Sequence, residues 1–224
     1  MNRIGDANMN PFADPALATG YESWYQGAGR RADQLEKDLL ARMLARFSSA
    51  STLLEVGCGS GHFARWFSEK TWQVTGLDIS LPMLSEAAHL NGTPYVLGDA
   101  LVLPFADNTF DLTALITTLE FVSGPILVLQ EALRVARQGL ILGILNRQSF
   151  LGWKLRRAGG PTWEAARFFT PTGIAQLVHR ATNHPVEITW RTTLWPLWQG
   201  SLPLPWGGFI GMAVQCSGTG GNNR

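Results

Sequence analysis

The chain has 224 residues and a formal net charge of +1, with 18 basic and 17 acidic side chains. This length suits one domain with a full core, and the balanced charge argues against a nucleic-acid binder that relies on bulk charge. Two cysteines, Cys58 and Cys216, are too few for a disulfide framework or a metal-binding set. A membrane-spanning helix needs about 18 consecutive apolar residues, and no apolar run in the chain approaches this length. We therefore expect a soluble, cytoplasmic protein.

The charge is unevenly distributed between the two halves of the chain. Residues 1–110 hold 8 basic and 12 acidic side chains, whereas residues 111–224 hold 10 and 5. The second half could therefore offer a mildly positive surface to an anionic substrate. Scattered, solvated arginines explain the same excess.

The first 50 residues predict one helix and an aromatic cluster. Residues 1–20 lack hydrophobic periodicity, and we expect them to be flexible unless they fold over a ligand. Aromatic side chains gather at 21–25, and apolar residues at three- and four-residue spacing then predict an amphipathic helix over 32–47. The aromatic cluster either packs onto the core or closes over a bound molecule.

A glycine-rich turn follows a short buried strand at 52–56. Gly57, Gly59 and Gly61 remove side chains where the chain turns sharply, and His62 opens a helix whose first amides point toward the turn. This arrangement is typical of nucleotide cradles. The third glycine comes one residue too early for the dinucleotide fingerprint, and His62 stands where that fingerprint requires glycine, so the spacing disfavours a pyrophosphate ligand.

Glu55 is a carboxylate near the end of this otherwise apolar strand. Burying it costs several kcal/mol unless a cation or hydrogen-bond donors meet it. A ligand that carries an amino-acid ammonium group would supply such a cation.

Two further acidic residues follow predicted strands. Asp78 ends a strand predicted from Gln73 and is placed to accept hydrogen bonds from ribose hydroxyls, although it could instead cap the helix predicted over 81–90. Ile79 would offer an apolar face to a base. Asp99 follows a short strand at 95–97 and can accept from an exocyclic amine, beside which the small Ala100 leaves room for a ring.

Four motifs in this order resemble one enzyme family: EVGCGSG at 55–61, LDIS at 77–80, GDA at 98–100 and LPFADNTFD at 103–111. Together they are similar to the small-molecule branch of class I S-adenosylmethionine (SAM)-dependent methyltransferases that includes the ubiquinone and menaquinone C-methyltransferases. The resemblance implies SAM as cofactor, S-adenosylhomocysteine as product and a small-molecule methyl acceptor. It implies cofactor contact at Glu55, Gly57, Cys58, Gly59, Gly61, His62, Asp78, Ile79, Asp99, Ala100, Ile116 and Thr117. Relatives often have His or Asn at 117–121, so no family base transfers to this chain.

The rest of the chain predicts two helices, at 125–135 and 171–180, and four strands, at 112–116, 140–145, 187–194 and 209–216. We therefore expect one α/β domain over 21–216, with a Rossmann-like, mostly parallel seven-stranded sheet, helices on both faces and an antiparallel last strand pair. An aromatic-rich segment at about 150–170 would form a substrate cover, and residues 217–224 are expected to be disordered.

Aromatic and charged residues outside the cofactor motifs are predicted to form the acceptor pocket. These are Tyr21, Trp24, Tyr25, Glu120, Arg147 and Trp163. Core packing of the aromatics and a structural hydrogen bond at Glu120 are the competing interpretations. The four scattered histidines have no metal-ligand spacing, and we predict no metal site.

Two other functions remain open at this stage. A Rossmann oxidoreductase that uses NAD is disfavoured by Glu55 and His62. A binding or partner subunit that keeps the SAM fold without catalysis is favoured by the absence of a family base at 117–121. The sequence leaves the acceptor, any general base and the oligomeric state undetermined.

Overall fold

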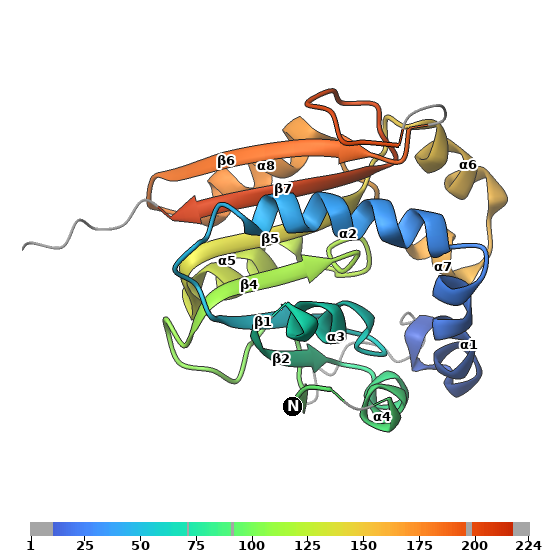
Figure 1. The fold of residues 1–224 in the computed structure, drawn as a ribbon, viewed down its shortest axis with the longest axis horizontal. Helices are drawn as coiled ribbons and strands as arrows, with labels where there is room; N and C mark the ends of the chain where they lie inside the picture. Colours follow the sequence, from blue (N-terminus) through green and yellow to red (C-terminus); the bar gives the residue numbers. More distant parts are fainter. Residues whose placement is uncertain (1–10, 71, 91, 196–198, 217–224) are drawn as a thin grey trace, which may run out of the picture.

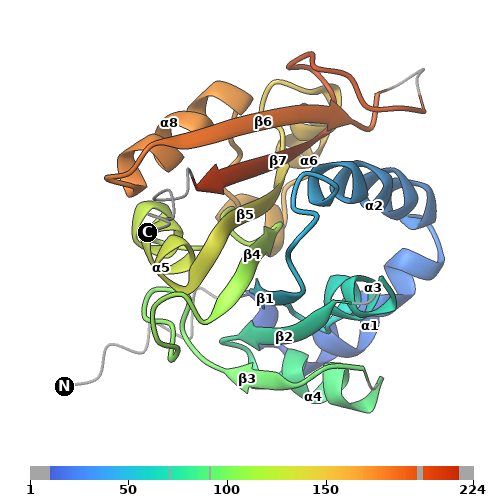
Figure 2. The same ribbon diagram turned by 60° about the vertical axis from the view of Figure 1, so that its left-hand side comes forward.

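The computed structural model describes residues 11–70, 72–90, 92–195 and 199–216, and its centre is a seven-stranded sheet (Figure 1). The strands are β1 (Thr52–Val56), β2 (Gln73–Asp78), β3 (Tyr95–Leu97), β4 (Phe110–Ile116), β5 (Ala136–Leu145), β6 (Val186–Thr193) and β7 (Phe209–Cys216). Their order is β3-β2-β1-β4-β5-β7-β6 (Figure 2). The first five are parallel, and β7 runs antiparallel to both β5 and β6. The predicted fold class is confirmed.

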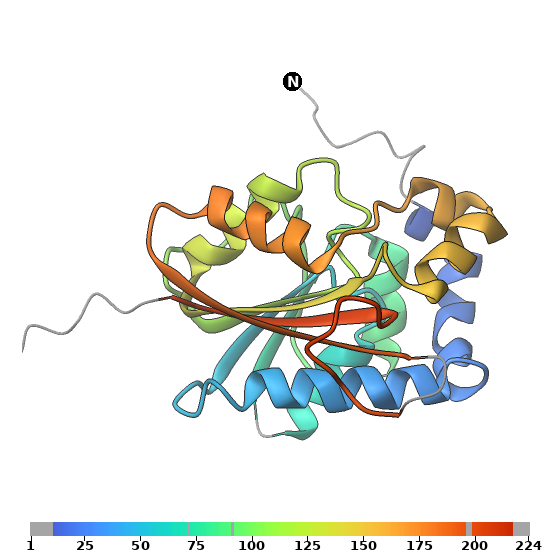
Figure 3. The ribbon, with the colours of Figure 1, turned by 90° about the horizontal axis from the view of Figure 1, so that it is seen from above.

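Helices cover both faces of this sheet (Figure 3). On one face lie α2 (Arg30–Leu44) and α3 (His62–Glu69), and on the other lie α5 (Pro125–Val135) and α8 (Pro171–Ala181). The helix α4 (Leu81–His89) contacts β2 and β3. The sheet is therefore buried on both sides, as the continuous apolar strands require.

The alternation of side chains along β1 decides which face Glu55 occupies. Leu53 packs into the core under α2 and α3, whereas Leu54 and Val56 pack into the core under α5 and α8. Since successive side chains of a strand point to opposite faces, Glu55 lies on the same face as Leu53. It is therefore buried on the side of α3.

The start of β5 differs from the prediction. We predicted a strand over 140–145, but β5 begins directly after α5 with Ala136, which pairs with Phe110. The guanidinium of Arg137 donates from Nε and Nη2 to Asp111 Oδ1, at 3.0 and 2.8 Å. This ion pair and the strand pairing explain why β5 begins before residue 140.

Three α-helices and one 3₁₀ turn were not predicted. They are η1 (Pro11–Ala13), α1 (Pro15–Gln26), α6 (Phe150–Ala158) and α7 (Pro161–Ala165). Residues 11–20, expected to be flexible, are thus mostly helical, because α1 packs on α4, α2 and η1 rather than forming on its own periodicity. Residues 1–10 of that expectation, and the predicted disorder of 217–224, lie outside the described residues.

Figure 1 shows α1, α6 and α7 gathered at the end of the molecule toward which the parallel strands point. Within the described ranges, no helix is long and apolar enough to cross a lipid bilayer. The added helices therefore enclose the edge of the sheet where ligands of open α/β folds bind.

Candidate functional site

The glycine turn after β1 adopts a conformation that favours glycine at three positions. Gly57, Gly59 and Gly61 have φ angles of 73°, 53° and 76°, and Gly61 stands directly before α3. A side chain at Gly57 would also collide with Thr118. The amides of Gly57 and Cys58 both donate to Leu77 O, at 2.7 and 3.0 Å, so β2 fixes the shape of the turn.

A cavity of about 940 Å³ opens beside this turn. It lies at the carboxyl ends of β1, β2 and β4 and is bounded on its other sides by residues of η1, α1 and the segment after α7. Of the predicted cofactor residues, its lining contains Glu55, Gly57, Cys58, Gly59, His62, Asp78, Ile79, Asp99, Ala100, Ile116 and Thr117. Eleven of the twelve are thus brought together, and only Gly61, which precedes α3, lies outside the lining.

Glu55 is the most unusual group in this cavity. Its side chain is 2% exposed, and Oε2 has no hydrogen-bond partner among the described residues. Burial and the charge of Asp78 raise the pKa of Glu55 well above its usual value, which Arg65 offsets only in part. An unpartnered, buried carboxylate oxygen in a cavity wall is a site for a ligand that brings a cation or a donor.

Asp78 braces the turn as well as lining the cavity. Its Oδ2 accepts from the amide of Gly59 and its Oδ1 from the amide of Ser80, each at 2.8 Å. Burial raises the pKa of Asp78 against the effect of these two amides. The cap of α4 is the hydroxyl of Ser80, which accepts from Met83 N, so Asp78 is not itself the helix cap.

Asp99 and Thr117 are positioned by their local backbone. Asp99 Oδ1 accepts from Leu101 N at 2.9 Å in the loop after β3. Thr117 has a φ of 50°, a conformation that is uncommon outside glycine and tends to occur at functional sites. Both residues therefore reach the cavity from strained or tightly turned loops at strand ends.

Cys58 lies in the cavity wall and is packed against the sheet. Its thiol is buried beside Gly76 of β2, and burial raises its pKa well above the usual range. A thiol with a raised pKa is a poor nucleophile. Cys58 therefore contributes backbone and shape to the turn.

Glu22 joins α1 to the glycine turn and to α3. Its Oε1 accepts from Ser60 Oγ at 2.6 Å and from Arg65 Nη2 at 2.9 Å, and its Oε2 lies 3.5 Å from His62 Nδ1. Burial alone would raise the pKa of Glu22, but His62, Ser60 and Arg65 together lower it to about 2. The first helix is thus attached to the cradle by a charged side chain.

His62 is held between acidic groups and an aromatic ring. Its Nε2 lies 2.7 Å from Asp33 Oδ1 and 2.9 Å from Lys37 Nζ, and its ring stacks on Tyr25 with centroids 3.6 Å apart and planes 9° apart. Burial lowers the pKa of His62, but Asp33 and Glu22 raise it above its usual value overall. His62 therefore orders the cover over the cavity as well as lining it.

The predicted acceptor residues divide into two groups. Tyr21, Tyr25 and Glu120 line the cavity. Trp24 is 48% exposed and packs beside Gly29, and Trp163 packs near Phe168 in the core. These two tryptophans, on α1 and α7, and the exposed Arg147, between β5 and α6, lie outside the cavity lining.

Glu120 resembles Glu55 in its environment. It is 1% exposed, Oε1 accepts from Leu145 N at 2.6 Å, and Oε2 has no partner among the described residues. Burial raises its pKa to about 8 although the amide of Leu145 lowers it. Glu36 of α2 is also buried, and burial, Asp33 and Glu120 raise its pKa to about 8. Glu120 therefore combines a structural hydrogen bond with a second oxygen that remains available.

Several residues that line the cavity were not predicted from the sequence. They are Phe12, Phe63, Leu77, Met83, Gly98, Leu101, Thr118, Phe121, Val122, Ser123, Ala165, Ala166 and Arg167. Most are neighbours of predicted residues and could have been included by extending each motif. Phe12 and Arg167 carried no such signal, because they belong to segments without periodicity that reach the cavity only through tertiary packing.

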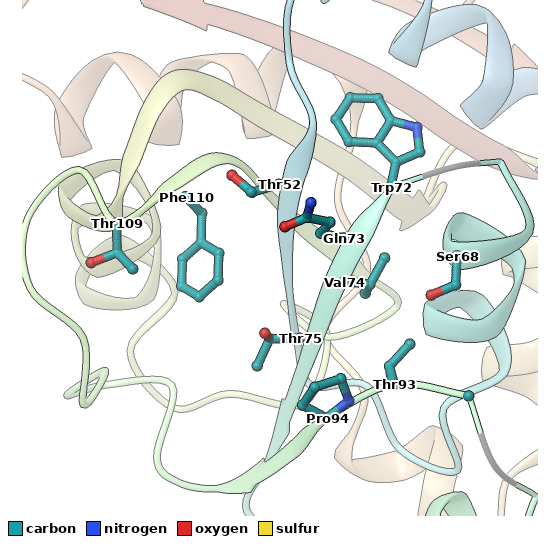
Figure 4. A pocket seen from close by; sticks show the side chains of 11 residues that line it. Thr52, Ser68, Trp72, Gln73, Val74, Thr75, Thr93, Pro94, Thr109 and Phe110 are labelled. Atoms are coloured by element: carbon teal, nitrogen blue, oxygen red, sulfur yellow. The ribbon is translucent and has the colours of Figure 1, made fainter.

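A second hollow, of about 450 Å³, lies at the opposite edge of the sheet (Figure 4). Its walls are the amino ends of β1 and β2 and the segments before β3 and β4, and none of the described residues that line it is Asp, Glu, Lys, Arg or His. It contains none of the predicted site residues. In the part of the chain that the structure describes, no group of three or more His, Cys, Asp or Glu side chains could hold a metal ion.

A known protein family and several curated proteins are similar to part of this chain. Residues 54–144 match the family described as "Methyltransferase domain". An uncharacterised protein of Methanocaldococcus jannaschii is 40% identical over 101 residues, which cover 44% of this chain and 47% of that protein. A malonyl-[acyl-carrier protein] O-methyltransferase of Serratia marcescens is 32% identical over 119 residues, covering 52% and 47%. The chain thus spans about half the length of the curated relatives it matches.

Solved structures match over nearly the whole chain. A SAM-dependent methyltransferase of Thermotoga maritima, described as a possible histamine N-methyltransferase, has a TM-score of 0.76 and 25% identity, covering 91% of this chain and 97% of that one. A magnesium protoporphyrin IX methyltransferase of Synechocystis with bound S-adenosylhomocysteine has a TM-score of 0.63 and 16% identity, covering 88% and 94%. At 16% identity, the likeness to the Synechocystis enzyme shows a similar fold and no more.

Proposed function

We propose that this chain, a member of the class I SAM-dependent methyltransferases with its methyltransferase domain at residues 54–144, transfers the methyl group of SAM to a small-molecule acceptor. The observation that carries the proposal is the unpartnered Oε2 of Glu55 in the cavity wall. NAD has no ammonium group to meet this carboxylate, whereas SAM has one. We further propose that the protein works in the cytoplasm.

The residues around the glycine turn fit SAM in both charge and shape. Glu55 would receive the ammonium group, and the bare backbone at Gly57 and Gly59 would allow close approach of the amino-acid portion. Asp78 would accept from the ribose hydroxyls, since a carboxylate oxygen that accepts one amide can accept a further donor. The loop with Asp99 and Ala100 would receive the adenine, with Ile79 against its face.

The acceptor would lie between the cradle and the cover formed by η1, α1 and the segment after α7. This part of the cavity is lined by Phe12, Tyr21, Tyr25, Phe121, Ala165, Ala166 and Arg167. The aromatic rings favour a flat or apolar acceptor, and the polar groups fix its orientation. The aromatic cover would also keep water away from the reacting groups.

Bound SAM supplies an electrophilic methyl group that is activated by its own positive sulfonium. The protein's part is to align the acceptor and exclude water, which can account for much of the rate enhancement. Glu120 is the proton acceptor we propose, because this residue lines the cavity, its Oε2 has no partner among the described residues, and its pKa of about 8 suits proton transfer near neutral pH. Its Oε1 stays bound to Leu145 N, which fixes the orientation of the carboxyl group.

Titration calorimetry with SAM, S-adenosylhomocysteine and NAD tests the cofactor, and a screen with methyl-labelled SAM against cell extract tests transfer. We expect saturable binding of SAM and S-adenosylhomocysteine, no binding of NAD, and label in a low-molecular-weight product. Glu120→Gln should keep SAM affinity within about threefold while lowering turnover at least tenfold. Binding of SAM without transfer to any acceptor would favour a non-catalytic SAM-fold subunit, and binding of NAD alone would refute the assignment.

A further inference from the structure

Four large apolar side chains are exposed on two segments at the end of the molecule that holds the cavity. Phe150 and Trp153 of α6 are 64% and 50% exposed. Leu204 and Trp206, in the connection from β6 to β7, are 41% and 57% exposed. Exposed apolar patches of this kind on a folded domain indicate a contact with another molecule.

Hydrogen bonds hold these side chains on adjoining segments. The Nδ2 of Asn146 donates to Pro205 O at 2.7 Å and to Gly207 O at 2.8 Å, on either side of Trp206. Ser149 caps α6 by accepting from Gly152 N at 2.8 Å. The connection from β6 to β7 and the start of α6 are therefore tied together through the buried Asn146 (Figure 1).

The rings of α6 are ordered in spite of their exposure. Phe150 stacks on Trp153 with centroids 5.8 Å apart and planes 25° apart. The guanidinium of Arg157 lies 5.6 Å from the centroid of the Trp153 ring. The patch is thus a preformed surface, and little side-chain entropy is lost when it binds.

Basic residues outnumber acidic ones in the segment that carries Phe150 and Trp153. Residues 147–167 contain five basic side chains and one acidic side chain, Glu164, whereas the whole chain carries a formal net charge of only +1. Lys154 and Arg157 are exposed on α6, and neither forms an ion pair with a described acidic residue. Residues 199–207 carry no charge at all. We call Phe150, Trp153, Lys154, Arg157, Leu204 and Trp206 the α6 surface.

This surface is connected along the chain to the part of the cavity that we assign to the acceptor. The chain passes from α6 into α7, and the residues directly after α7, Ala166 and Arg167, line the cavity. Figures 1 and 3 show α6 and α7 side by side at this end of the molecule. A partner bound to the α6 surface would therefore lie at the same end of the molecule as the cavity.

We propose that the α6 surface binds the headgroup region of an anionic lipid bilayer. Helices that lie in a membrane interface present Trp, Phe and Leu to the acyl boundary and Lys or Arg to the headgroups, which is the composition found here. Basic residues near an anionic leaflet each strengthen the attraction, and aromatic rings prefer the headgroup level. The aliphatic Leu204 favours acyl chains over nucleic-acid bases, with which it cannot stack.

Cosedimentation of the full chain with vesicles tests the proposal. The vesicles are phosphatidylcholine alone, or phosphatidylcholine with about one third phosphatidylglycerol. We expect binding to the anionic vesicles to be at least about tenfold stronger than to the neutral ones, and to weaken in about 0.5 M NaCl. This experiment does not depend on methyl transfer, so its result is independent of the proposed function.

Two variants and a matched control locate the contact. Lys154→Glu/Arg157→Glu and Phe150→Ala/Trp153→Ala should each bind anionic vesicles at least about tenfold more weakly than the parent. Arg42→Glu/Arg180→Glu makes the same charge change at exposed positions of α2 and α8, and should bind like the parent.

Vesicle binding is compared only for variants that circular dichroism melting shows to be folded. Equal binding to neutral and anionic vesicles, no binding to either, or parental binding by both α6 variants would overturn the proposal. Binding of the parent to a single-stranded oligonucleotide or an acidic protein, without binding to the vesicles, would overturn it as well.

Discussion

Replacing Glu55 with Gln tests whether a carboxylate at the end of β1 holds the ammonium group of SAM. Burial and Asp78 raise the pKa of Glu55 well above its usual value, which favours the protonated carboxyl group in the ligand-free protein. An arriving ammonium group favours the ionised form and drives the proton off. A hydrogen bond to a charged group contributes about 1.5 to 3 kcal/mol, so Glu55→Gln should weaken SAM binding about 10- to 100-fold.

Calorimetry with two ligands separates this effect from a general disturbance of the site. 5′-Methylthioadenosine lacks the amino-acid portion of SAM, so its affinity for Glu55→Gln should stay within about twofold of the parent. In buffers of different ionisation enthalpy, SAM should release more protons on binding to the parent than on binding to Glu55→Gln. Equal weakening of both ligands, or an unchanged proton release, would refute the role of Glu55.

Three further substitutions test other parts of the site and fold. Asp78→Ala should weaken SAM about a hundredfold and also lower the melting temperature, because Asp78 accepts from Gly59 N; calorimetric affinity within about threefold of the parent would contradict a ribose contact. The raised pKa of Glu36 means that its stabilising contribution is full below about pH 4 and is lost as the pH rises toward 8, so Glu36→Gln should raise the melting temperature at about pH 9 and not at about pH 4. Asp111, whose pKa Ser51, Thr52 and Arg137 hold low, contributes stability above about pH 4 that is lost in acid; Asp111→Ala should cost about 3 kcal/mol in urea unfolding at pH 7 and much less at about pH 2.

The centre of the site could be predicted because its signals are local. The glycines of the turn, with Glu55 before them and Asp78 at the end of the next strand, stand at fixed distances along the chain. Parallel strands bring their carboxyl ends to one edge of the sheet, so these residues meet whatever the rest of the chain does. The buried strands could also be predicted, because five of the seven residues of β4 are apolar and most of β7 is apolar as well.

The cover could not be predicted because it has no local signal. Helix α1 contains Gly20 and lacks an apolar stripe of regular spacing, and it is held by contacts with α2, α4 and η1. The sequence does not show how α1 is rotated about its axis. It therefore could not predict which of Tyr25 and Trp24 faces the cavity. The structure turns Tyr25 onto His62 and leaves Trp24 half exposed. Arg167 reaches the cavity only because α6 and α7 bring the chain back to it.

Charge also joins α1 to the cradle. The Oε1 atom of Glu22 accepts both from Ser60, inside the glycine turn, and from Arg65, on the helix after it. Its hydrogen bonds lower the pKa of Glu22 to about 2, so the carboxylate stays ionised at any physiological pH, while the pKa of His62 is raised. Moving α1 away would expose these charges singly and remove the Tyr25 ring from His62. Since Ser60 belongs to the turn that we assign to SAM, the position of the cover and the shape of the cofactor cradle depend on the same few hydrogen bonds.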